Sequence, residues 1–344
     1  MPEILKEPIY EPGAWTSAEL AVDHSWVYHF SNADLAELDQ ALSNVRDRGA
    51  GNFDREDFVL PTLNSFFKDV IQQIEFGRGC ALVKGLDVLA YDSNSLETLY
   101  WGIAVHLGSM MHQNPDGDLI GHVTDGGRDY KSNNVRGYST KAELRPHCDP
   151  TDVVALLCKH PSKSGGESCI ASSLAIYNEI LETHPEYLEV LAQGFHFDLR
   201  GEGVTTDPDE TSFNRVPTFS YFEGRMSCRY NSRTMIEGME KAGKSLNEEG
   251  LRAVHYVAEL ALSPKFRYDM TFEQGDIQIL SNHGILHSRK GFEDFPEPER
   301  KRDLLRLWLN LRNGRKLAPE FADRLNTGPR GGICLKDDRR PHQA

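Results

Sequence analysis

The sequence of 344 residues lacks the features that mark membrane, secreted and repeat proteins. No stretch approaches the ~18 uninterrupted apolar residues that a membrane-spanning helix needs. The first residues contain no apolar segment of the kind found in secretion signals, and internal repeats and low-complexity tracts are absent. We therefore expect a cytoplasmic globular protein with no membrane partner.

Positive charge and cysteine are both scarce. The chain has 38 Lys and Arg against 52 Asp and Glu, and the net charge of −14 argues against a nucleic-acid partner. The six cysteines are scattered without a Cys-X-X-Cys pair, which favours free thiols in a reducing compartment. A small molecule is thus the expected partner, and a homo-oligomer is compatible with the sequence.

The most informative stretch runs from Leu144 to Asp149 and contains His147-Cys148-Asp149. A His-X-Asp pair supplies one imidazole and one carboxylate, and the distant His287 can complete three ligands on one face of a metal. Such a two-histidine, one-carboxylate set leaves positions open on Fe(II) for a cosubstrate and oxygen. The tripeptide alone is a weak signal, because such sequences also occur in surface turns.

Two arginines beyond His287 strengthen this interpretation. The segment 300–311 is charged at its start and apolar from Leu304, which predicts a largely buried strand. Residues an even number apart share one face of a strand, so Arg302 and Arg306 are expected on the same side. Buried guanidinium groups are costly unless each meets an anion, and arginine binds carboxylates through two parallel hydrogen bonds. The strand therefore predicts two carboxylates, or one carboxylate and another acceptor, beside it.

The motifs around these residues follow one another in a recognisable order. They are Gly77 to Gly85, Leu107-Gly108 with Gln113, His147-Cys148-Asp149, Gly165-Gly166-Glu167-Ser168, Gln274-Gly275-Asp276, Asn282 with His287, and Arg302 with Arg306. In this order the chain resembles the TauD/TfdA family of Fe(II)/2-oxoglutarate-dependent dioxygenases, which includes taurine dioxygenase and clavaminate-synthase-like enzymes. It departs from taurine dioxygenase at Ser168, which replaces a threonine, and Cys148 fills the variable middle position of the metal motif.

The resemblance implies a metal site and a cosubstrate site. The catalytic metal Fe(II) would be held by His147, Asp149 and His287, and 2-oxoglutarate would bind Arg302 together with Ser168. Arg306 would contact either a substrate acid or the cosubstrate. Reaction with O2 would release succinate and CO2 while the substrate is hydroxylated, desaturated or cyclised. Halogenation is not expected, because halogenases of this type lack the carboxylate that Asp149 provides.

The expected substrate is a small molecule that carries a carboxylate. Glu143, Tyr138 and His112 lie near the metal motif in sequence and are candidate substrate contacts, although each also fits a solvated or structurally paired side chain. A carboxylate at Glu143 would suit an amine, which favours an amino acid. Two other functions stay open: a different metalloenzyme on the same triad, and a non-catalytic barrel that binds a small ligand.

The coarse secondary structure predicts an α+β fold, namely a double-stranded β-helix (a cupin-like jelly roll) wrapped by helices. Helices are expected near 35–45, 63–75, 96–107 and 248–262, and strands near 80–83, 153–158, 168–171 and 277–280. We expect a single domain, with a helical prelude over residues 1–75, a core with lid insertions over 76–311, and a polar tail of little structure over 312–344. The segments 110–138 and 198–215 are predicted to be loops, and the second is a candidate lid.

Overall fold

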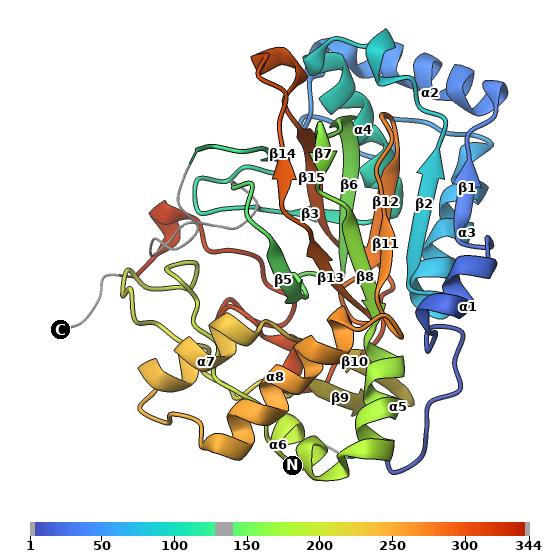
Figure 1. Cartoon of the computed structure of the whole chain (residues 1–344). Coiled ribbons are helices and arrows are strands. Elements are labelled where there is room, and N and C mark those ends of the chain that lie inside the picture. The colour runs from blue at the N-terminus through green and yellow to red at the C-terminus, as the bar shows by residue number, and fades with distance from the viewer. Residues whose placement is uncertain (1–3, 128–139, 341–344) are drawn as a thin grey trace.

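Two antiparallel sheets form the centre of the molecule in the computed structural model, which describes residues 4–127 and 140–340 (Figure 1). The larger sheet has the order β1 (Val27–His29), β2 (Cys80–Lys84), β12 (Ile277–Ser281), β6 (Val153–His160), β15 (Asp303–Asn310) and β3 (Ser109–Met111), and β4 (Gly121–Val123) also pairs with β15. The smaller sheet has the order β11 (Tyr268–Met270), β8 (Ser168–Ser172), β13 (Ile285–Arg289) and β5 (Leu144–His147). Within these two sheets only β1 and β2 run parallel.

Strand β15 explains why the two faces of the larger sheet differ. Leu305, Leu307 and Leu309 belong to a buried cluster that also contains residues of three helices, whereas Leu304 and Trp308 belong to a second cluster shared with the smaller sheet. Side chains alternate along a strand, so the second face is the one that looks toward the smaller sheet. A cavity lined by residues of both sheets lies between them.

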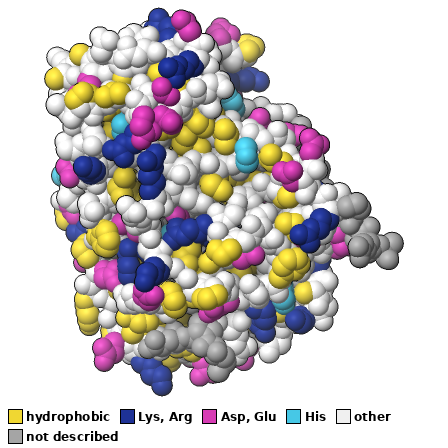
Figure 2. Space-filling model, turned by 180° about the vertical axis from the view of Figure 1, so that it is seen from behind, with side chains coloured by type: hydrophobic (Ala, Val, Ile, Leu, Met, Phe, Trp, Pro, Cys, Tyr) yellow, Lys and Arg dark blue, Asp and Glu magenta, His cyan; other side chains and the backbone are white. Residues whose placement is uncertain are grey.

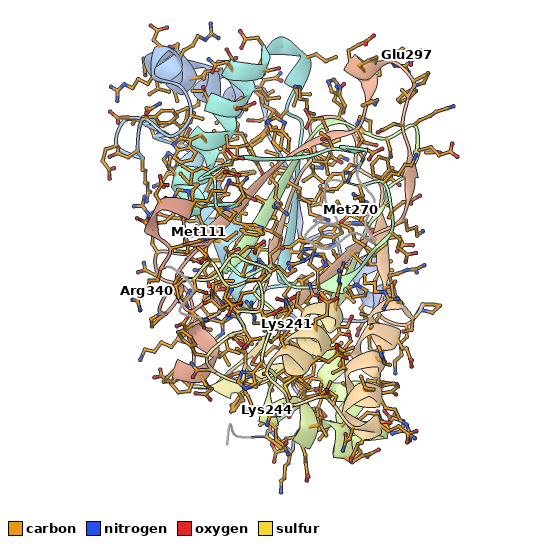
Figure 3. All side chains as sticks on the ribbon, turned by 90° about the vertical axis from the view of Figure 1, so that its left-hand side faces the viewer. Met111, Lys241, Lys244, Met270, Glu297 and Arg340 are labelled. Atoms are coloured by element: carbon orange, nitrogen blue, oxygen red, sulfur yellow. The ribbon has the colours of Figure 1, made fainter. Side chains whose placement is uncertain are left out.

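Helices cover the outer sides of this arrangement. On the larger sheet they are α2 (Asn32–Val45), α3 (Leu63–Phe76) and α4 (Ser93–Leu107), and α2 begins with a capping box in which Ser31 and Asp34 satisfy each other's backbone groups. A second group packs beside the hairpin β9 (Phe219–Phe222) and β10 (Arg225–Cys228): α5 (Ser173–Thr183), α6 (Pro185–Gln193), α7 (Ser232–Lys241) and α8 (Glu248–Leu262). Figure 3 shows Glu297, before β15, at one end of the molecule and Lys244, between α7 and α8, at the other.

The remaining elements are short. They are α1 (Ser17–Val22), α9 (Pro319–Ala322), the strand pair β7 (Ser164–Gly165) with β14 (Phe292–Glu293), and 3₁₀ turns at Arg46–Arg48, Val88–Ala90, Pro298–Arg300 and Lys336–Asp338. The face seen in Figure 2 mixes basic and acidic side chains, with hydrophobic ones in small separate groups. Among the described residues, no helix has the length and apolar character needed to cross a membrane.

Several predicted elements are confirmed, and two expectations were wrong. The helices at 63–75 and 248–262, the strands at 80–83 and 277–280, and the α+β class agree with the structure. The predicted loop 110–138 contains β4, which is too short to show a hydrophobic pattern and pairs with β15. The tail from residue 312 is not unstructured, because Phe321, Leu325 and Ile333 are buried in the core.

The tail is anchored by a buried carboxylate, Asp152. Its oxygens lie 2.8 Å from Nε2 of His283 and 3.6 Å from the guanidinium of Arg324, and Arg330 also pairs with it. Burial acts to raise the pKa of Asp152, but the hydrogen bond from His283 and the arginine charges hold it well below its usual range. The polar composition of the tail thus reflects buried ion pairs, which a sequence pattern does not distinguish from solvated charges.

Asp152→Asn should therefore destabilise the fold strongly. Removing one partner of a buried ion pair leaves uncompensated charges, which costs about 3–5 kcal/mol of unfolding free energy. Urea unfolding at neutral pH, followed by circular dichroism, measures this loss. Asp116→Asn is the matched control, because Asp116 pairs with Lys336 at the surface and such pairs contribute at most about 1 kcal/mol. Equal losses in the two variants would contradict a structural role for the Asp152 cluster.

Candidate metal and cosubstrate site

Strand pairing brings the predicted triad together. His147 ends β5 and stands opposite His287 of β13 in the antiparallel register, and Asp149 follows in the turn after β5. One donor atom from each of the three residues lies within 4.8 Å of the others. Asp149 is 3.9 Å from Nε2 of His147 and 3.5 Å from Nε2 of His287, so both imidazoles face the carboxylate.

Neighbouring groups fix the orientation of these three side chains. Nδ1 of His147 lies 2.9 Å from the carbonyl of Arg145, which turns Nε2 toward the other two residues. The indole Nε1 of Trp308 donates to Asp149 at 2.9 Å, and the backbone N–H of Asp149 donates to Asn282 at 3.0 Å. Asn282 thus joins the turn before His287 to the first ligand segment. Such outer contacts are typical of metal sites.

The protonation states suit a divalent metal. Burial lowers the pKa of the His147 imidazole to about 4, and the charges of His287 and Arg200 act in the same direction. Burial acts to raise the pKa of Asp149, but His287, Arg306 and His147 hold it far below its usual range. Neutral imidazole and ionised carboxylate are the forms that bind metal. Two nitrogens and one carboxylate oxygen in this arrangement fit Fe(II) with open coordination positions.

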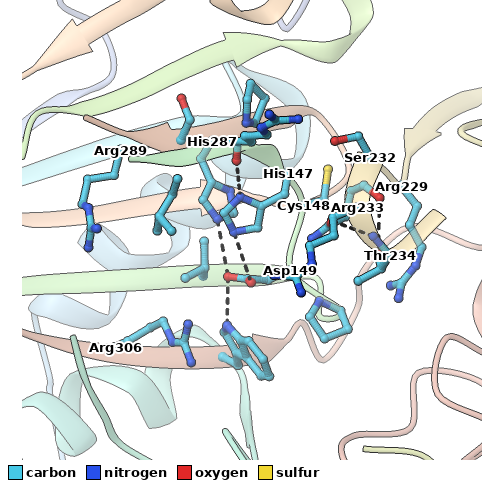
Figure 4. A pocket seen from close by; sticks show the side chains of 18 of the residues that line it. His147, Cys148, Asp149, Arg229, Ser232, Arg233, Thr234, His287, Arg289 and Arg306 are labelled. Carbon is cyan, nitrogen blue, oxygen red and sulfur yellow. Dashed lines mark hydrogen bonds and ion pairs between the residues drawn. The ribbon is translucent and has the colours of Figure 1, made fainter. Parts of the chain in front are cut away.

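The triad lies in the wall of a cavity of ≈ 610 Å³ between the two sheets (Figure 4). Its size is typical of small-ligand sites. Ser168, Arg302 and Arg306 line the same cavity, so the structure brings together all the residues predicted for metal and cosubstrate. The segment 198–215, predicted as a lid, contributes Asp198, Leu199, Arg200 and Glu202 to the lining.

Arg302 is a buried cation with no ion-pair partner in the described part of the chain. The residue is 4% exposed, its Nη1 donates to the carbonyl of Val123 at 3.4 Å, and its guanidinium lies 5.1 Å from the ring of Phe292. Burial lowers its pKa to about 10, so it is charged at neutral pH. Gly166 has a φ of +75°, and a Cβ there would come within 3.4 Å of Arg302 Nε. The left-handed backbone of this Gly165-Gly166 turn, beside the guanidinium, is one that glycine adopts readily.

The other two cosubstrate candidates already have protein partners. Ser168 donates to the side-chain carbonyl of Gln278 at 2.9 Å. Nε of Arg306 donates to Gln113 at 2.8 Å, and its guanidinium lies 4.6 Å from the Trp308 ring. Arg306 also lines the cavity, so it can contact an anion bound there.

The structure does not bring the predicted substrate contacts together. His112 and Glu143 are absent from the cavity lining, and His112 instead contacts the carbonyl of Gly117 in its own loop. Tyr138 lies outside the described residues. Trp308 and Arg229 also line the cavity, although neither was predicted from the sequence. Trp308 follows Arg306 by two positions on the same strand face, and Arg229 is a single arginine after β10 with no motif around it.

Comparisons of sequence agree with this site. The family described as "Taurine catabolism dioxygenase TauD, TfdA family" matches residues 44–308. The chain is 31% identical over 322 residues to FR-33289 synthase of Streptomyces rubellomurinus, with 92% of this chain and 94% of that protein covered. It is 30% identical over 310 residues to the taurine hydroxylase-like protein SAT17 of Stachybotrys chartarum, with 86% and 77% covered.

Solved structures of iron oxygenases share the fold at low sequence identity. Asparagine oxygenase in complex with Fe(II), hydroxyasparagine and succinate superposes with a TM-score of 0.62 at 14% identity, over 83% of this chain and 93% of that one. OrfP in complex with Fe and α-ketoglutaric acid gives 0.59 at 12% identity, over 83% and 93%. The double-stranded β-helix is thus confirmed, and the alternatives of another metalloenzyme or a non-catalytic barrel fall away. The chain belongs to the TauD/TfdA family and is an Fe(II)/2-oxoglutarate-dependent dioxygenase.

Proposed function

We propose that His147, Asp149 and His287 hold the Fe(II), that Arg302 with Ser168 binds the distal carboxylate of 2-oxoglutarate, and that the enzyme oxidises a small acidic molecule. One observation carries this proposal. A buried arginine without an ion-pair partner among the described residues lines the same cavity as three convergent metal ligands. Arginine that meets a carboxylate forms strong, directional hydrogen bonds, so the cosubstrate would compensate the buried charge.

The chain's own residues orient and shield the reactants. Trp308 and Asn282 hold Asp149, the Arg145 carbonyl holds the ring of His147, and Val154 with Leu156 contributes apolar walls that exclude water. When bound, the metal and 2-oxoglutarate supply the oxidising chemistry with O2, and succinate and CO2 are the co-products. The protein then determines which substrate C–H bond lies near the metal, and hence whether hydroxylation, desaturation or ring closure follows.

The charge of the cavity favours an acidic substrate. Seven arginines and four carboxylate residues line it, although the whole chain has a net charge of −14. Arg306, next to the triad, is our candidate for binding the acid group. Asparagine oxygenase was solved with hydroxyasparagine and OrfP with L-Arg, so amino acids are the first class to screen. Glu143, the residue predicted to meet an amine, is not among the described residues that line the cavity.

Two wider proposals concern the whole chain. Residues of the prelude and of the tail join the same buried clusters as the sheets, which supports a single domain. All six cysteines are free thiols, and five are buried, which supports a reducing compartment such as the cytoplasm.

His287→Ala should abolish tight Fe(II) binding, because a two-ligand site lacks a third of its protein donors. The Fe(II) affinity should fall by more than ~100-fold, which is the upper range for removing a residue that only hydrogen-bonds to a metal ligand. Anaerobic Fe(II) titration calorimetry measures this. His112→Ala is the control, since His112 does not line the cavity. Unchanged Fe(II) affinity in His287→Ala would refute the ligand assignment.

Arg302→Ala should weaken 2-oxoglutarate binding by about 100-fold, because a buried charge-assisted contact is lost. Anaerobic titration of the Fe(II)-loaded protein, followed through the metal-to-ligand charge-transfer band, measures the affinity. In Arg306→Ala the band should form at nearly the same 2-oxoglutarate concentration as in wild type. Arg302→Lys should recover part of the affinity that Arg302→Ala loses. If Arg306→Ala lost the band instead, the two arginines would have exchanged roles.

A further inference from the structure

A second arginine in the cavity, Arg229, has no ion-pair partner among the described residues. It follows β10, is 8% exposed, and its Nε and Nη1 have no hydrogen-bond partner in the same part of the chain. Its guanidinium lies 4.8 Å from the ring of Phe197, and no carboxylate of residues 4–127 or 140–340 lies within 4.0 Å of it. Other equally buried arginines differ: Arg315 pairs with Glu75 at 3.5 Å and Arg324 with Asp152 at 3.6 Å.

The neighbourhood of Arg229 does not neutralise its charge. Burial and the charge of Arg324 lower its pKa to about 9, while Asp149 and Asp323 act in the opposite direction without reaching it as ion-pair partners. The guanidinium is therefore still cationic at neutral pH. The other acids on the same side of the cavity have their own cations: Asp198 pairs with Lys241 at 3.0 Å and Glu237 with Arg233 at 2.9 Å.

A buried, unpaired guanidinium destabilises the ligand-free protein unless an anion meets it. It lines the reaction cavity, with Ser232 and Thr234 beside it in the lining (Figure 4). The same view places Arg229 on one side of the triad and Arg289 and Arg306 on the other. An anion at Arg229 is therefore at a different place from one at Arg306.

We propose that Arg229 is the anchor of a second anion subsite, which binds an acidic group of the substrate, a carboxylate or a tetrahedral oxyanion, on the side of the triad remote from Arg306. This subsite rests on the proposed function, because it positions a substrate relative to the same metal. A substrate held there has its acidic end fixed beside Phe197, and the atoms that follow extend toward the metal ligands. Arg229 is then a specificity-determining residue that selects for acidic molecules.

The test combines stability with anion binding in Arg229→Gln, Arg229→Lys and a control, Arg233→Gln. Arg233 lines the same cavity but is paired with Glu237. Without ligands, Arg229→Gln should raise the unfolding temperature by ~2 °C or more, because a buried unpaired charge is removed. If Arg229 had a purely structural role, Arg229→Gln would lower the unfolding temperature, and this result would overturn the proposal.

Binding is measured with acetate and methanesulfonate as probes on the Fe(II)- and 2-oxoglutarate-loaded protein, without oxygen, through the relaxation of their methyl protons. Arg229→Gln should weaken binding of at least one probe by about tenfold, Arg229→Lys should weaken it less, and Arg233→Gln should match wild type. The preferred probe separates a carboxylate from a tetrahedral oxyanion. No probe binding to wild type, or equal binding in Arg229→Gln, would refute the subsite.

The charge-transfer band recorded in the same samples separates the two proposals. If the band forms in every variant but probe binding does not depend on Arg229, the subsite fails and the metal and cosubstrate assignment stands. If the band is missing in the folded, iron-loaded wild type, the cosubstrate assignment fails as well.

Discussion

The register between β5 and β13 is the constraint on which the active site depends. Because His147 and His287 stand opposite each other in this pair, the two imidazoles meet without any help from loops. The adjacent pair β13–β8 carries Ser168 opposite Arg289, which places the start of β8 at the same cavity. A slip of one residue would turn one of the two histidines to the other face of the sheet and remove the site. The two histidines are therefore as well fixed as the sheet itself, and contacts with Trp308 and Asn282 hold Asp149 in the turn after β5.

Buried charged side chains elsewhere in the molecule form ion pairs. Away from the cavity, arginines meet buried carboxylates, such as Glu75 with the half-buried Arg225 and the buried Arg315, and Asp152 with Arg324. Within the cavity this pairing stops at Arg302 and Arg229. Both remain cationic in a chain whose net charge is strongly negative. This contrast supports the two proposed anion sites, because the same fold provides a carboxylate for buried arginines elsewhere.

The parts of the site that the sequence predicted are those encoded by local spacing. His147 and Asp149 are two residues apart, and Arg302 and Arg306 lie on one strand face, so a short pattern suffices to connect them. Gln278 and Arg229 reach the cavity from distant segments, which no spacing records. Trp308 lies two residues beyond Arg306 on the same strand face, so spacing alone could have pointed to it. The same limit explains the tail, where Asp152 and Arg324 meet across long sequence separation. Glu143 lies close to the metal motif in sequence, but its side chain does not line the cavity.

Arg302 and Arg229 also bear on how the enzyme handles its ligands in sequence. Each buried guanidinium raises the free energy of the empty cavity, so binding of an anion both neutralises a charge and stabilises the surrounding fold. In our proposal, cosubstrate binding at Arg302 would neutralise one positive charge of the cavity and would leave Arg229 without an ion-pair partner among the described residues. A second anion would then still be attracted to Arg229. If Arg229 binds the acidic group of the substrate, the charge of the cavity would select for acidic molecules. The shape of the cavity would then select among them.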